Sequence, residues 1–310
     1  MSKHISIMPD ECMHLLDIKE NGTYIDGTLG RGGHSRLILE QLKKGHLYAF
    51  DLDTQAIEES KENLKEYPNV TYIHDNFMNM NKYVKHVDGI FLDLGVSSPQ
   101  FDEGERGFSY RFDGPLDMRM NKDDILSAYD VVNGYEEKEL SRIFFEYGEE
   151  QFARPIARKI VAKRANKPLE TTFELVEAIK EALPSKILNK KGHPAKKCFQ
   201  AIRIEVNHEL DSLKAFLNSF DEILNPDGTV VIITFHSLED RMVKQKFKSL
   251  STVAVDKRIA LRPEEIKEAP YVLISRKALV ASPEELENNP RAKSAKLRGI
   301  RKVGNRIWQK

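Results

Sequence analysis

The sequence predicts an α/β protein in which a parallel, doubly wound sheet is interrupted by a helical insertion. Two observations predict it. Short apolar runs alternate with amphipathic helical segments in the first third of the chain, and further apolar runs return near its end. Between them, from 105 to 204, helical spacing continues without any strand pattern. Strands separated by helices are typical of parallel sheets, so the first and last parts together form the expected sheet domain.

Four strands are expected before the insertion. The first contains Tyr24 and Ile25, and the second ends at Asp51. Val70–His74 and Val87–Leu94 are the third and fourth. A helix is expected within Met1–Asp17, another after the glycine-rich turn that follows Ile25, and a third over Thr54–Tyr67, because apolar residues recur there at helical spacing.

The rest of the chain predicts helices first and then closing strands. Residues 101–121 show no useful periodicity, and a long helix over 198–224 is expected to end at the turn signal Asn225–Gly228. Thr229–Phe235 is the fifth strand. Tyr271–Ala281 and Ala295–Val303 are interpreted as a closing hairpin. Four helices are expected inside the insertion, around Ile125–Val132, Glu136–Phe145, Ala153–Ala165 and Thr172–Leu183, the last with a capping box formed by Thr171 and Glu174.

Composition indicates a globular protein of the cytoplasm. Of 310 residues, 40% are hydrophobic and 31% are charged, and no apolar run is long enough to span a bilayer. No secretory signal is visible, and the two cysteines, Cys12 and Cys198, fit a reducing compartment. The formal net charge is zero, but 288–310 carries eight Lys or Arg residues and no acid. Such local basic stretches are compatible with an acidic polymer as partner.

The glycine-rich turn Asp26–Gly33 favours S-adenosylmethionine as ligand. Its glycines depart from G-x-G-x-x-G, and no Gly-Lys-Ser/Thr follows, which excludes a Walker-type phosphate loop. Asp26 would repel a pyrophosphate but suits an ammonium group. Asp51, at the end of the next strand, is placed to accept from a ribose diol. The alternative is an ordinary tight turn between strand and helix.

Two further strand ends carry candidate residues. Phe77 follows the third strand and is expected against the adenine, although core packing explains it equally well. The fourth strand ends at Asp93, followed by Ser97 and Ser98. These acceptors are suited to holding an exocyclic amino group, although the Pro-Pro-aromatic element usual in amino-methylating enzymes is missing. A structural turn is the alternative.

His236 and Asp240, after the fifth strand, are candidates for proton handling or substrate contact. Capping of a helix by Ser237, with Asp240 at capping-box spacing, explains part of the same stretch. The nine histidines show no metal-ligand spacing, so no metal site is expected. No G-x-S-x-G elbow is present, which disfavours a Ser-His-Asp hydrolase.

Together these segments resemble the bacterial 16S ribosomal-RNA cytosine-N4 methyltransferases of the RsmH (MraW) type. The resemblance extends over almost the whole chain, with Leu29 standing where an aromatic is frequent and a poor match over Val253–Pro270. The matching segments are Tyr24–Arg36, Asp88–Gln100, Arg106–Ser109, Asp113–Met120, Tyr147–Glu150, Phe199–Arg203, Val206–Asn207, Phe235–Arg241 and Asn289–Arg298.

The resemblance implies a class I S-adenosylmethionine-dependent sheet domain, 1–104 with 205–310, whose seventh strand is antiparallel. It implies an inserted RNA-recognition domain over 105–204, and methylation of a cytidine N4 in the decoding region of 16S rRNA in the small ribosomal subunit. Asp93 is the candidate for accepting a hydrogen bond from the amino group, with direct methyl transfer. The implied cofactor contacts are Gly32, Gly33, His34, Asp51, Phe77, Asp93 and Gln100.

Tyr110-Arg111-Phe112 and the lysines of 186–197 are candidates for placing the RNA by stacking and phosphate contact; a solvated surface loop is the alternative. A homodimer is left open. Two other functions also remain: a methyltransferase of the same fold acting on DNA, protein or a small molecule, and a non-catalytic RNA-binding assembly factor.

Overall fold

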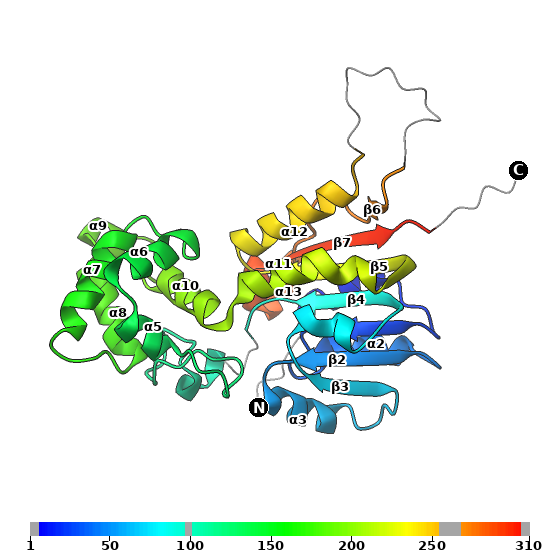
Figure 1. The fold of residues 1–310 in the computed structure, drawn as a ribbon, viewed down its shortest axis with the longest axis horizontal. Helices are drawn as coiled ribbons and strands as arrows, with labels where there is room; N and C mark the ends of the chain where they lie inside the picture. Colours follow the sequence, from blue (N-terminus) through cyan, green and yellow to red (C-terminus); the bar gives the residue numbers. More distant parts are fainter. Residues whose placement is uncertain (1–5, 97–100, 254–267, 305–310) are drawn as a thin grey trace, which may run out of the picture. The chain divides into compact units, whose positions relative to one another are not determined.

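The computed structural model describes residues 6–96, 101–253 and 268–304. The chain divides into two compact units (Figure 1). Unit 1 comprises Met1–Gly95 and Asp211–Lys310, and unit 2 comprises Val96–Leu210. Unit 2 begins before, and ends after, the expected insertion of 105–204. Among the described helices, none is long and apolar enough to cross a membrane.

Unit 1 is built on a seven-stranded sheet, as counted over the described residues, with the order β3-β2-β1-β4-β5-β7-β6. The first five strands run parallel, while β7 pairs antiparallel with both β5 and β6. This topology agrees with the predicted Rossmann-like class I sheet. The strands are β1 (Thr23–Asp26), β2 (His46–Asp51), β3 (Val70–His74), β4 (Val87–Asp93), β5 (Leu224–Thr234), β6 (Tyr271–Leu273) and β7 (Lys296–Lys302).

Both faces of the sheet are covered, which explains its continuous apolar strands. Ile90 and Leu92 of β4 pack with residues of α11 and α12, whereas Phe91 lies on the other face with residues of α1 and α2. In Figure 1, α11 and α12 lie along the strands of the sheet. The helices of unit 1 are α1 (Pro9–Leu16), α2 (Gly33–Gln41), α3 (Thr54–Asn63), η1 (Phe77–Lys82), α11 (Glu209–Ser219, whose first two residues are assigned to unit 2), η3 (Phe220–Glu222), α12 (Ser237–Leu250), α13 (Pro283–Asn288) and η5 (Pro290–Ser294).

Three sequence predictions need correction. The fifth strand begins at Leu224 and not at Thr229, so it includes Asn225–Gly228, which was expected to be a turn. The expected single helix over 198–224 is two helices, α10 and α11, because His208 adopts the left-handed conformation with φ of 50° and ends α10. The expected strand Tyr271–Ala281 is only three residues long in β6, and Leu279 forms an isolated bridge with Leu297 instead. Neither interruption contains a proline or a glycine, which are the residues that ordinarily mark breaks in a sequence.

Unit 2 is helical and has its own core. Leu140, Ile143 and Phe144 of α6 are fully buried in it together with Ile156 and Ile160 of α7. The expected capping box of Thr171 and Glu174 is present at the start of α8. The helices are η2 (Gly104–Arg106), α5 (Ala128–Gly134), α6 (Glu137–Glu146), α7 (Ala153–Arg164), α8 (Thr172–Glu181), α9 (Ser185–Leu188) and α10 (Lys196–Asn207).

The irregular stretch 101–121 is held to the helices of unit 2 by hydrogen bonds to buried side chains, among them those of Thr172 and Asn207. Asn207, at the end of α10, accepts from the Met120 N–H at 2.7 Å. Its amide donates to the carbonyl oxygens of Met118 at 2.8 Å and Arg203 at 2.9 Å. A buried backbone group must be paired somewhere, so a segment without its own secondary structure depends on such side chains.

We expect Asn207→Ala to destabilise unit 2 by about 1–3 kcal/mol, because it leaves buried backbone groups at Met118 and Met120 without a partner. Thermal and urea unfolding of the full chain measure the change. Asn189→Ala, which truncates an exposed asparagine, is the matched control and should be neutral. Equal stability of the two variants would show that Asn207 does not hold this segment.

Candidate active site

Acidic residues stand at the carboxyl ends of three neighbouring parallel strands. Asp26 ends β1, Asp51 ends β2 and Asp93 ends β4. Because β1 lies between β2 and β4, the three ends meet at one edge of the sheet. This edge is where open α/β sheets bind ligands.

The glycine-rich turn passes over this edge and is held by the acids themselves. Asp51 accepts from the Gly30 N–H at 2.7 Å and from the Asp53 N–H at 2.8 Å. Gly30 and Gly32 have positive φ values of 52° and 81°, which glycine adopts without strain. At Gly32 a side chain would also meet Leu64 at 2.9 Å. The turn therefore depends on Asp51 and on these two glycines.

Asp26 is held inside the turn. Its carboxylate accepts from the Ser35 hydroxyl at 2.6 Å and from the Thr28 N–H at 3.0 Å. The Thr28 hydroxyl in turn accepts from the Asp93 N–H at 2.6 Å, which joins the ends of β1 and β4. Thr28 and Ser35 are contributors that sequence reasoning missed. A short polar residue on each side of a glycine-rich turn was the only signal for them.

In the described part of the chain, the Asp93 carboxyl group has fewer hydrogen-bond partners than those of Asp26 and Asp51. Its Oδ1 is buried without a hydrogen-bond partner among the described residues. Its Oδ2 lies 3.6 Å from His34 Nδ1, which is too far for a hydrogen bond. His34 is buried, and its Nε2 lies 2.9 Å from the carbonyl oxygen of Ile7, so Nε2 carries a proton and Nδ1 faces Asp93.

The acids are electrostatically coupled. Burial, together with the nearby charges of Asp26 and Glu239, raises the pKa of Asp93 to about 8. Burial also raises the pKa of Asp26 and that of Asp51 to about 6, against the hydrogen bonds that each accepts. Asp93 is therefore mainly a neutral acid at pH 7 in the ligand-free protein. A cation bound at this edge would favour its ionised form, whereas an anion would not.

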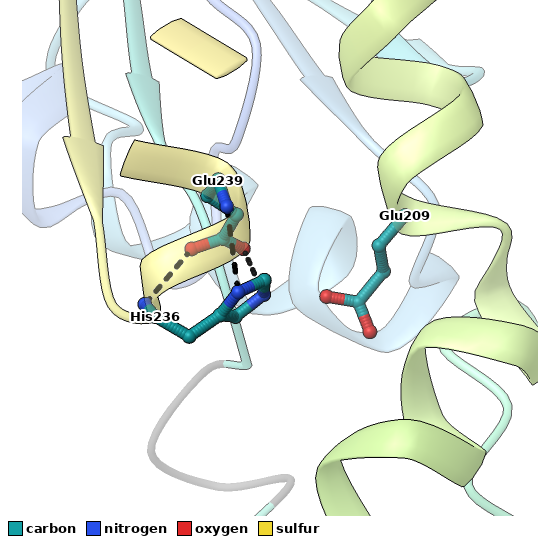
Figure 2. A group of neighbouring side chains, drawn as sticks. All are labelled: Glu209, His236 and Glu239. Atoms are coloured by element: carbon teal, nitrogen blue, oxygen red, sulfur yellow. Dashed lines mark hydrogen bonds and ion pairs between the residues drawn. The ribbon is translucent and has the colours of Figure 1, made fainter. Parts of the chain in front are cut away.

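The segment after β5 contributes Glu239, which sequence reasoning missed. Glu239 Oε2 accepts from the Phe235 and His236 N–H groups at 2.9 and 3.3 Å, and Oε1 lies 3.0 Å from His236 Nε2 (Figure 2). His236, and not Ser237 as expected, is the N-cap of α12, with Glu239 completing the capping box. Glu209, also drawn in Figure 2, pairs with Arg203 at 2.8 Å within unit 2.

Asp240 has a structural role in this arrangement. It accepts from Arg298 at 2.8 Å and from Lys296 at 3.1 Å, so it joins α12 to β7, and these contacts hold its pKa below the usual range despite burial. The expected alternative, a capped helix start, is present, but its residues are His236 and Glu239 and not Ser237 and Asp240. The N-cap lies one residue before the expected Ser237, because a histidine ring nitrogen can also accept a hydrogen bond from the first turn of a helix. Sequence rules favour Ser in this role.

The remaining predicted residues are placed as follows. Gly33 is the first residue of α2, directly before His34. Phe77 begins η1, and its Cβ lies 3.0 Å from where a side chain at Gly27 would begin. One edge of its ring meets Phe216, with centroids 5.9 Å apart, so it takes part in core packing. Gln100, like Ser97 and Ser98, lies outside the described residues.

The chain is similar to known methyltransferases over nearly its whole length. Residues 1–303 match the family described as the MraW methylase family. The ribosomal RNA small subunit methyltransferase H of Streptococcus pyogenes serotype M4 is 52% identical over 309 residues, covering 97% of this chain and 98% of the relative. The protein of the same name from Streptococcus dysgalactiae subsp. equisimilis has the same identity and coverage. Among solved structures, an rRNA methylase from Streptococcus thermophilus has a TM-score of 0.38 and 11% identity, with 95% and 93% of the two chains covered.

Because the folded pKa of Asp93 is raised, Asp93 lowers the stability of the ligand-free protein as pH rises from about 4 to about 8. Below this window the carboxyl is protonated in both states, and above it the full cost of ionisation is present. We expect Asp93→Asn to flatten the fall in stability between pH 6 and 8, measured by urea unfolding. Asp10→Asn, at an exposed acid of unit 1, should leave that slope unchanged. A slope unaltered by Asp93→Asn would contradict a neutral Asp93.

Proposed function

The chain belongs to the MraW methylase family, and we propose that it transfers a methyl group from S-adenosylmethionine to the exocyclic N4 of a cytidine in 16S rRNA of the small ribosomal subunit. The expected cytidine lies in the decoding region. The similarity to two proteins named ribosomal RNA small subunit methyltransferase H supports a ribosomal RNA acceptor. The predictions of this family and of S-adenosylmethionine as methyl donor are confirmed.

One observation carries the chemistry of the proposal: the acids at the strand ends fit a cationic ligand with hydroxyl groups. This edge is acidic and rich in hydrogen-bond acceptors because it carries Asp26, Asp51 and Asp93. Among the described residues, Asp93 Oδ1 has no hydrogen-bond partner, so it is free to accept from a ligand. S-adenosylmethionine carries an ammonium, a sulfonium and a ribose diol, and when bound it supplies an electrophilic methyl group. Gly32, Gly33, His34, Asp51 and Phe77 are the described residues that we propose to hold it, with Gln100 added from the family resemblance.

Asp93 is the residue that we propose to act on the acceptor. The lone pair of a cytosine amino group is conjugated with the ring, so a carboxylate that accepts its hydrogen increases the electron density on nitrogen. In the transfer a nitrogen–carbon bond forms, the sulfur–carbon bond breaks with its electrons remaining on sulfur, and the nitrogen then loses one proton. Asp93, once ionised, is positioned at the strand end to accept that hydrogen.

The protein supplies positioning besides this acceptor. The Ile7 carbonyl fixes the His34 ring, and the Thr28 hydroxyl fixes the backbone of Asp93, so the ring and the strand end are held before any ligand binds. The Met8 N–H donates to Glu285 of α13 at 2.7 Å, which anchors the segment that carries Ile7. Holding the reacting atoms in attack geometry is a large source of rate in such a direct transfer.

The experiment that tests the proposed function is methyl transfer from labelled S-adenosylmethionine to free 16S rRNA and to assembled small subunits, followed by nucleoside analysis. N4-methylated cytidine is the expected product. Label in another nucleoside, or only in DNA, protein or a small molecule, would contradict the proposed acceptor. S-adenosylmethionine binding without transfer to any of these would favour a non-catalytic assembly factor.

Asp93→Asn should lower kcat strongly, by about 100-fold or more, as expected when a positioned acid or base is lost. The wild-type kcat/KM should rise with pH between 6 and 9, because it reports ionisation of Asp93 in the ligand-free protein, while the residual kcat/KM of Asp93→Asn stays flat. Unfolding transitions control for a loss of fold. A near-normal rate with an unchanged pH profile would exclude Asp93 from the chemistry.

Asp51→Ala should weaken S-adenosylmethionine binding by about 1–3 kcal/mol, because it removes an acceptor and also releases the Gly30 N–H that shapes the turn. Isothermal calorimetry measures the affinity. Asp17→Ala, at an acid on the same unit that pairs with Arg301, is the control and should bind normally. Unchanged affinity in Asp51→Ala would remove Asp51 from the site.

A further inference from the structure

A surface of unit 2 carries cations that the protein does not neutralise. Residues 182–199 contain five lysines and no acid. Other lysines of unit 2 are paired with acids: Glu181 forms ion pairs with Lys159 at 3.0 Å and with Lys163 at 2.6 Å. Within the described part of the chain, Lys180 and Arg111 form no ion pair, and both are exposed. The same holds for Lys186, Lys190 and Lys191.

Two aromatic rings lie near Lys180 and Arg111. Tyr110 and His193 are stacked, with centroids 4.3 Å apart and planes inclined by 14°. Tyr110 also meets the buried Phe199 edge to face, with centroids 5.7 Å apart, so the pair is anchored in the core of unit 2. Both rings remain partly exposed. Because the ring pair is held by the core on one side and exposed on the other, little conformational entropy is lost when it binds a ligand.

The charge of this surface comes from Arg111 and Lys180 and not from the histidine. The Ala195 N–H donates to His193 Nδ1 at 3.3 Å, so this nitrogen is an acceptor. Burial lowers the pKa of His193, and the nearby cations Lys180 and Arg111 lower it further. Those two electrostatic contacts also place both cations close to the ring pair. A neutral imidazole stacked on a phenol, beside two unpaired cations, is the composition of a single-stranded nucleic-acid site.

We propose that Tyr110, His193, Arg111 and Lys180 form a docking surface for a single-stranded segment of the substrate RNA. Arg111 and Lys180 contact its phosphates, and an unstacked base extends the Tyr110–His193 stack. Charge complementarity argues for a polyanion, and the ring pair argues for one with bases. The proposal rests on the proposed function for the identity of the RNA, but binding at this surface does not depend on methyl transfer.

The test measures binding of a fluorescently labelled, single-stranded RNA oligonucleotide to the full chain as a function of salt. In Arg111→Gln/Lys180→Gln the dependence of log K on log salt should become shallower by roughly 1.4, because two phosphate contacts on a single strand are lost. The control Lys159→Gln/Lys163→Gln removes the same two positive charges from lysines that are both paired with Glu181, and should keep the wild-type slope.

The ring pair is tested separately. Tyr110→Leu should weaken RNA binding by roughly 5- to 150-fold, the range expected for loss of one base stack, whereas Tyr110→Phe should bind like the wild type. Thermal unfolding shows whether Tyr110→Leu is folded; the surface variant Arg111→Gln/Lys180→Gln tests the proposal even if it is not. Affinity that falls with the cations but not with a folded Tyr110→Leu overturns the base-stacking site in favour of a plain polyanion surface.

Failure of this proposal and failure of the proposed function give different results. S-adenosylmethionine affinity, measured by calorimetry, should be unchanged in every variant. If the wild type methylates 16S rRNA and binds the oligonucleotide while all variants bind equally well, the docking surface is wrong and the proposed function stands. If the wild type methylates no RNA and binds none, both are wrong.

Discussion

Burying a carboxyl group is unfavourable unless hydrogen bonds or a cation compensate it, and the edge of the sheet in unit 1 holds one buried carboxyl group, that of Asp26, and two partly buried ones. The protein satisfies two of them itself: Asp26 accepts from Ser35 and Thr28, and Asp51 accepts from Gly30 and Asp53. Asp93 is left with a buried oxygen that has no partner. Asp93 is also the acid to which the neighbouring parts relate: Thr28 of the turn binds its backbone N–H, the His34 ring lies 3.6 Å from its Oδ2, and the charge of Glu239 raises its pKa.

The unfavourable burial of these acids also links Asp93 to binding of the methyl donor. An acid that is neutral without ligand and ionised beside a cation responds to binding of the methyl donor, and an ionised Asp93 is the acceptor that the amino group needs. The glycine-rich turn matters in this account less for flexibility than for its donors, since the Gly30 N–H holds Asp51 in place.

Much of the sheet could be predicted from sequence because β2, β4 and most of β5 are short apolar runs, and β3 has the predicted bounds. The strand-end acids were found for the same reason. The break at His208 was missed, since a non-glycine residue in the left-handed conformation leaves no pattern in the sequence. Thr28 and Glu239 were missed as site residues because their importance comes from contacts between strand ends. His236 was a candidate for proton handling or substrate contact, and the structure shows it as the N-cap of α12. In unit 2 most helices could be predicted from periodicity. The role of Asn207 and the Tyr110–His193 stack could not, because both depend on contacts between segments distant in sequence.

The central claim is that binding of the cationic methyl donor ionises Asp93. Calorimetric titration with S-adenosylmethionine at pH 7, in buffers of different ionisation enthalpy, measures the protons released on binding. The account predicts net proton release that is larger than with S-adenosylhomocysteine, which lacks the sulfonium charge, and that is lost in Asp93→Asn. Binding without proton release, or with the same release in Asp93→Asn, would contradict it.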